Sequence, residues 1–161
     1  MKFLRNLIIV IVGLFIALFL LGRLSDKETP APEPIPETPT PTETALTSLK
    51  GVIIYVDAPL AESEITSPLT ITGRAPGNWF FEASAPVTLT DWDGLIIAEG
   101  HLNAVGEWMT TDYVPFTGML TFTTPPCTDT YCKRGSLILQ KDNASGEPQF
   151  DDSVEMTVMF R

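Results

Sequence analysis

The sequence is poor in the residues that build most catalytic and metal sites. It holds one histidine, His101, and two cysteines among 161 residues, and the motif Gly-x-Ser-x-Gly does not occur. One histidine gives no Ser-His-Asp or Cys-His set. Two cysteines and one histidine also fall short of the four ligands of a closed zinc site. We therefore expect neither enzymatic activity nor a bound cofactor.

Basic residues are scarce as well. The chain has 10 lysines and arginines against 20 acidic residues, which gives a formal net charge of −10. The first 50 residues hold five of each sign, so the whole net charge lies from Gly51 onward. Nucleic acid requires a basic footprint, and anionic lipid attracts basic segments. The acidic part is therefore expected to bind no nucleic acid. Its charge fits solubility, cation binding or a basic partner, and solubility is the favoured interpretation.

The N-terminal region contains one long apolar run. Residues 6–22 carry no charge, and Leu7 to Leu21 are apolar on every side, as in a helix surrounded by lipid. At ~1.5 Å per residue, this run reaches about 25 Å, the short end of what crosses a hydrocarbon core. Residues 1–25 are thus predicted to form a transmembrane helix.

The charges around this run predict its orientation. Lys2 and Arg5 precede it and should stay in the cytoplasm, which leaves everything after Arg23 outside. A cleaved signal peptide is the alternative, but no good small-x-small cleavage site follows Leu21. No nearby cysteine could carry a lipid. We expect an uncleaved signal anchor that holds the chain in the cell membrane as a single-pass, extracytoplasmic protein.

A proline-rich stretch follows the anchor. Six prolines lie between Pro30 and Pro41, interleaved with Thr, Glu and Ala. Such a segment favours extended polyproline II and cannot bury enough apolar surface to fold. Residues 26–50 are predicted to be a disordered linker, of which residues 26–48 alone reach roughly 70 Å at ~3.1 Å per residue. A proline-rich ligand for a partner domain is the alternative.

Residues 51–161 show period-two patterns and no convincing helical period. Such alternation is typical of half-buried strands. Asp93-Gly94 and Ser145-Gly146 supply turn signals between the runs. The pattern predicts an all-β domain, a two-sheet antiparallel sandwich. The strand-like runs are 52–56, 69–72, 87–90, 95–98, 108–114, 119–123, 136–140 and 154–160.

This part also contains a series of short motifs, which are Ser67 to Ala75, Phe81-Glu82-Ala83, Asp91-Trp92-Asp93-Gly94, Gly106 to Thr110 and the closing segment from Gly135 to Phe160. In their order and spacing these motifs resemble a known family, the immunoglobulin-like domain of bacterial spore germination proteins. The resemblance implies an immunoglobulin-like fold in a bacterial cell-envelope protein with no established enzymatic activity.

Two functions fit this organisation. The first is a membrane-tethered binding or scaffolding module whose partner is an envelope protein or a cell-wall polymer. The second is an envelope glycan hydrolase, which needs two carboxyl groups roughly 5 to 10 Å apart. Fifteen acidic side chains from Gly51 onward guarantee some close pairs in any fold, so their number does not favour the hydrolase.

Three aromatic residues are candidates for contact with a partner, namely Trp79, Phe80 and Trp92. Trp79 and Phe80 begin a run of three aromatics that ends at Phe81. A strand turns only alternate side chains inward, so at least one of the three is expected at the surface. The functional interpretation is a platform for a glycan or a partner protein, and the structural one is a core aromatic where a strand changes sheet.

The two cysteines, Cys127 and Cys132, are predicted to form a disulfide, as expected outside the cytoplasm. The four residues between them differ from the two of thioredoxin-like motifs. Closing so short a loop contributes about 2 kcal/mol by the chain-entropy model.

Two smaller predictions concern charged residues. Arg74 is the only basic residue between Gly51 and Lys133, and we predict that it pairs with Glu82 across neighbouring strands. Asp91 and Asp93 resemble the start of a calcium loop, but the rest of that pattern is missing, which favours a hairpin turn ending at Gly94.

Overall fold

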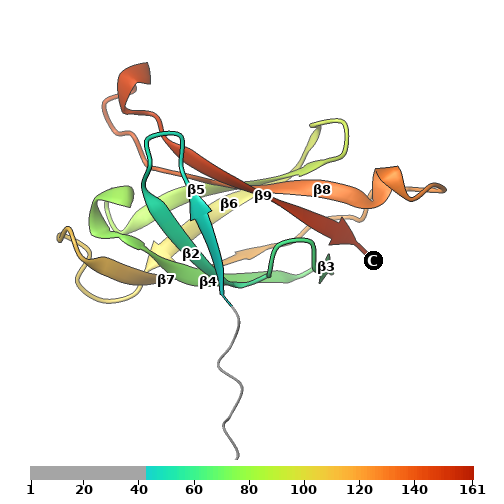
Figure 1. Ribbon diagram of the computed structural model, residues 1–161, viewed down its shortest axis with the longest axis horizontal. Helices are drawn as coiled ribbons and strands as arrows, with labels where there is room; N and C mark the ends of the chain where they lie inside the picture. The colour runs from blue at the N-terminus through green and yellow to red at the C-terminus, as the bar shows by residue number, and fades with distance from the viewer. Residues whose placement is uncertain (1–42) are drawn as a thin grey trace, which may run out of the picture. The chain divides into compact units, whose positions relative to one another are not determined.

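The computed structural model describes residues 43–161, and the predicted transmembrane helix at 1–25 lies outside the described residues. Within 43–161, no helix is long and apolar enough to cross a membrane. This part of the chain is built from strands and short 3₁₀ turns (Figure 1). The strands are β1 (Thr44–Thr47), β2 (Ile53–Ala58), β3 (Glu64–Ile65), β4 (Leu69–Pro76), β5 (Ser84–Asp91), β6 (Ile96–Ala104), β7 (Tyr113–Leu120), β8 (Arg134–Gln140) and β9 (Ser153–Phe160).

The strands of the described residues join into one curled sheet, where the sequence had predicted two separate sheets. Their order is β1-β2-β4-β7-β6-β5-β8-β9-β3, and all neighbours are antiparallel except β3 and β9. β6 pairs with β7 only through Leu102–Ala104, so the sheet turns from one layer to the other at this short ladder. In Figure 1, β4 and β7 run along one side of the domain and β8 along the other.

The core lies between the two layers. Strands β4, β7, β8 and β9 turn alternate side chains inward, as β4 does with Leu69, Ile71 and Ala75. One apolar cluster takes residues from both layers, so the packing is that of a sandwich although the ladder is continuous. Fully buried members of this cluster include Ile54, Val56, Ile71, Leu89, Leu102, Leu137, Leu139 and Val158.

The folded domain begins earlier than the sequence predicted. Thr44–Thr47 form β1, which pairs with β2 as an edge strand, so the predicted linker 26–50 extends too far into the domain. Leu46 is partly buried against the core and gives this short strand its apolar contact. The predicted runs 108–114 and 119–123 are also corrected, because one strand, β7, replaces both and residues 105–112 form a loop.

The strand directions sort the loops into two ends of the domain. β1 and β8 start at the end that contains Glu43, and β5 and β9 finish there. This Glu43 end carries the turn between β5 and β6 and the loop 121–133 that contains both cysteines. The opposite end carries the loops 48–52, 77–83, 105–112 and 141–152.

Candidate binding surface

The predicted disulfide is confirmed. Cys127 and Cys132 are bonded, with their Cα atoms 5.6 Å apart, in the loop between β7 and β8. Cys132 is 8% exposed and anchors the loop to the domain. Tyr131–Lys133 form a 3₁₀ turn directly before β8, so the disulfide fixes the residues that lead into this strand.

A tight turn joins β5 to β6 beside this loop. Oδ1 of Asp91 accepts hydrogen bonds from the backbone N–H groups of Asp93 and Leu95, each at 2.9 Å. Gly94 has φ +82°, a conformation that glycine adopts without steric cost. The hairpin turn is therefore confirmed. Residues 43–161 contain no group of three or more His, Cys, Asp or Glu residues that could hold a metal ion.

The turn and the disulfide loop bring two exposed aromatic rings together. Trp92 is 52% exposed and Tyr131 is 59% exposed. Their ring centroids lie 5.2 Å apart at an interplanar angle of 85°, an edge-to-face pair. The rings border a surface groove of about 240 Å³, which we call the Trp92–Tyr131 groove. It is lined by Asp91, Trp92, Tyr131, Arg134, Gly135, Ser136 and Thr157.

The sheet register explains why polar groups line the rest of this groove. Ser136 pairs with Thr157, so two hydroxyl side chains that line the groove form a row across β8 and β9. Thr90 pairs with Ser136 from the other side, but it is buried and is not part of the lining. The sequence neighbours of the two lining residues, such as Leu137, face the core, which places this row on the outer side of the sheet. Arg134 lies two residues before Ser136 on β8, so its side chain is on the same outer face of the sheet. It lines the groove together with the aromatic pair.

Trp79 and Phe80 do not belong to a binding surface, which corrects the prediction. They are 1% and 4% exposed, and both belong to the core cluster. The alternation rule fails here because Gly77–Trp79 form a 3₁₀ turn after β4, so two successive aromatic side chains can face inward. Phe81 is the exposed member of the run, at 46%. Of the three predicted partner-contacting residues, Trp92 alone lies at the surface.

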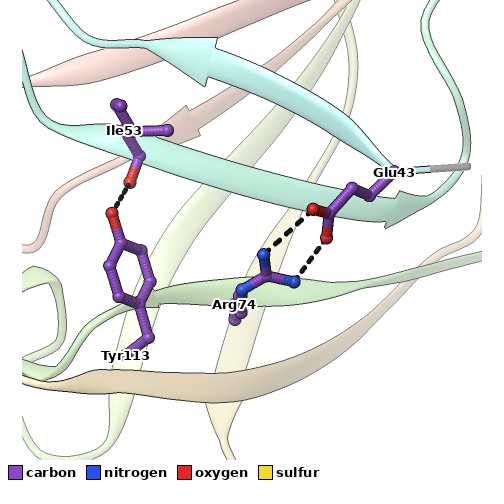
Figure 2. A network of polar contacts seen from close by, with 4 residues as sticks. All are labelled: Glu43, Ile53, Arg74 and Tyr113. Atoms are coloured by element: carbon purple, nitrogen blue, oxygen red, sulfur yellow. Dashed lines mark hydrogen bonds and ion pairs between the residues drawn. The ribbon is translucent and has the colours of Figure 1, made fainter.

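Arg74 pairs with Glu43, which corrects the predicted pair with Glu82. Nη1 and Nη2 of Arg74 donate to the two carboxylate oxygens of Glu43, the second at 3.0 Å, as Figure 2 shows. The guanidinium also lies 3.9 Å above the ring centre of Tyr55, a cation–π contact. Glu82 lies in the turn before β5, with φ +50°, at the opposite end of the domain.

This pair perturbs both groups and ties the start of the domain to the sheet. The hydrogen bond from Arg74 lowers the pKa of the Glu43 carboxyl, and Glu43 in turn raises the pKa of Arg74. Nearby, the hydroxyl of Tyr113 donates to the carbonyl oxygen of Ile53 at 3.0 Å (Figure 2). These contacts hold β1, β2, β4 and β7 together on the outer side of one layer.

Asp151 and Asp152 are neighbouring carboxylates at the end of the domain opposite to Glu43, and their hydrogen bonds stabilise the fold. Asp152, 5% exposed, accepts a hydrogen bond from the Ser48 hydroxyl at 2.8 Å and one from the Lys50 N–H at 3.3 Å. It thereby joins the turn between β1 and β2 to the loop before β9. Its neighbour Asp151 accepts a hydrogen bond from the Asn143 side chain at 2.7 Å. These contacts give no support to a hydrolytic pair of carboxyl groups at this end.

The opposite end also carries an exposed apolar loop. Met109 is 74% exposed, and the loop that contains it packs directly over Gly77. A Cβ atom at Gly77 would lie 2.2 Å from the carbonyl oxygen of Trp108 and 2.5 Å from that of Thr110. Only glycine therefore fits beneath this loop. Val105, 56% exposed, is the other exposed large apolar side chain on it, whereas Trp108 packs against the core.

Together, the continuous curled sheet, the single core and the loops at both ends define an all-β immunoglobulin-like domain. Residues 53–142, more than half of the chain, match the family described as the immunoglobulin-like domain of bacterial spore germination. The chain belongs to this family, which confirms the resemblance inferred from its motifs. Comparisons with curated proteins and with solved structures gave no significant match.

The sequence prediction missed most residues of the groove, among them Tyr131 and Arg134. Tyr131 lies inside the predicted disulfide loop, and Arg134 follows it. Both come close to Trp92 only because β5 lies beside β8. The paired residues of these two strands lie 44 to 52 positions apart in the sequence, and no local pattern encodes their pairing. An exposed aromatic inside a short disulfide loop was the available signal.

Proposed function

We propose that this protein is a membrane-tethered, extracytoplasmic binding module of the bacterial cell envelope without catalytic activity. In this proposal, residues 1–25 anchor the chain and the proline-rich stretch holds the immunoglobulin-like domain away from the bilayer. The domain then presents the Trp92–Tyr131 groove to another envelope component.

The groove is the observation that carries the binding role. Large aromatic side chains usually bury most of their surface, and Trp92 and Tyr131 leave about half exposed at one place. A disulfide and a hydrogen-bonded turn hold the two rings, so little conformational entropy is lost when a partner binds. Exposed aromatics on a rigid frame, beside a few polar groups, are typical of binding sites.

The tether is supported by the order of the sequence. An uncharged run of 17 residues precedes a stretch rich in proline, and the domain follows directly. The acidic charge of the domain keeps it soluble and disfavours adsorption to anionic lipid. These features favour a domain held near the membrane by its anchor and not by its own surface.

Protease treatment of intact cells tests the topology. We expect protease added outside to cut the proline-rich stretch and release a soluble fragment that contains residues 43–161. A cytoplasmic protein in the same cells serves as the control and should stay intact. If the fragment appears only after the cells are broken, the proposed orientation is wrong.

A further inference from the structure

We infer that the Trp92–Tyr131 groove binds an uncharged sugar chain, with one pyranose ring packed against the aromatic pair. This inference rests on the proposed function, because it names the ligand class of the same surface. It is carried by three properties of the groove: the geometry of its rings, the mixture of its polar groups and its charge balance.

The rings provide an apolar corner of suitable shape. Trp92 and Tyr131 meet at 85°, so they form two walls at a right angle and not a flat stack. A pyranose ring is flat on the scale of an indole and presents C–H groups on its faces. Packing such a face against one wall removes apolar surface from water on both partners.

The polar groups of the groove match sugar hydroxyls, which both donate and accept hydrogen bonds. Arg134 can only donate, the Asp91 carboxylate can only accept, and the hydroxyls of Ser136 and Thr157 can do both. Arg134 forms no ion pair with any residue of the described range 43–161. The Oδ1 atom of Asp91 is used by the turn, and its Oδ2 atom has no hydrogen-bond partner within the same range.

The charge balance selects an uncharged ligand. One carboxylate and one guanidinium line the groove, so it carries no net charge of its own. A polyanion would approach a domain with a large excess of acidic residues. That excess attracts a basic peptide, but inside the groove the peptide would meet the guanidinium of Arg134. An uncharged sugar chain is penalised by neither.

Titration of the full-length chain in detergent with uncharged sugar oligomers tests this inference. The probes are oligomers of N-acetylglucosamine and of glucose, and binding is followed by calorimetry and by tryptophan fluorescence. We expect saturable binding that Trp92→Ala and Tyr131→Ala each weaken about tenfold or more, because each removes one aromatic wall.

Phe150→Ala is the matched control, since Phe150 is an exposed aromatic, 49%, at the opposite end of the domain. Thermal unfolding of each variant checks that the fold is retained. The inference is overturned if no oligomer binds, or if Trp92→Ala and Phe150→Ala bind equally well. Tighter binding of an anionic polysaccharide than of both uncharged series would also overturn it.

A second arm separates this inference from the proposed function. Isolated envelopes of the producing bacterium are mixed with the chain and with the Trp92→Ala variant, before and after digestion of the envelope glycans. We expect Trp92-dependent binding that disappears on glycan digestion. Binding that survives glycan digestion but not protease would overturn the sugar ligand and leave the binding module standing. No Trp92-dependent binding would overturn both.

Discussion

Removal of the disulfide should destabilise the domain modestly and loosen one wall of the groove. The variant Cys127→Ser/Cys132→Ser opens a loop whose cysteines are separated by 5 positions. By the chain-entropy model, a disulfide that closes so short a loop raises the free energy of unfolding by about 2 kcal/mol. Tyr131 directly precedes Cys132, so the same change frees the ring that contacts Trp92.

Urea unfolding of the oxidised protein, the dithiothreitol-reduced protein and the double variant measures this effect. We expect the last two to lose about 2 kcal/mol alike, with an unchanged denaturant dependence. Tryptophan fluorescence in the absence of urea should also change, because Trp92 loses its ordered neighbour. The reduced protein is the control for the substitutions, since it has the native sequence.

Equal midpoints for the oxidised and reduced proteins would refute the reasoning, because they would show that other contacts hold the loop. A loss in the variant alone would assign the effect to the serine side chains. Unchanged fluorescence after reduction would show that the position of Tyr131 does not depend on the cross-link.

Three further predictions concern the sheet. Gly73→Ala would place a Cβ atom 2.1 Å from the carbonyl oxygen of Tyr55, so we expect a loss of at least about 1–3 kcal/mol in urea unfolding. Leu89→Ala, at a fully buried position, should cost about 2–5 kcal/mol in the same assay, and a smaller loss would contradict the assigned core. Because Arg74 lowers the pKa of Glu43, the pair stabilises the fold above the ordinary glutamate pKa, and the contribution is lost as the pH falls through the lowered value. Glu43→Gln should therefore be less stable than wild type at neutral pH and equal to it in acid, by a small amount because the pair is exposed.

Strand positions could be predicted wherever the apolar alternation was long. β4 and β9 bury every second residue along their length, and the sequence shows that period directly. In β5 the predicted run 87–90 is a strand, but all four of its residues are buried. β1 has only four residues and follows a proline-rich stretch, so its threonines were assigned to the linker. β3 has two residues, too few for any period, and its parallel pairing with β9 depends on the fold.

The candidate site could be predicted only in its local parts. The disulfide and the turn at Asp91 involve residues a few positions apart, so short motifs sufficed. The predicted partner of Arg74 is wrong because the true partner, Glu43, directly precedes β1, and the sequence did not reveal this strand. The prediction that Trp79 contacts a partner is wrong because the alternation of strand side chains does not continue across the 3₁₀ turn Gly77–Trp79.

The most direct test of the binding role is photo-crosslinking in intact cells. A photoreactive residue replaces Trp92 in one version of the full-length chain and Phe150 in another, since both positions are exposed and lie at opposite ends of the domain. The account predicts capture of an envelope component from position 92 and little or none from position 150. Capture from position 150 alone, or from neither position, would contradict it.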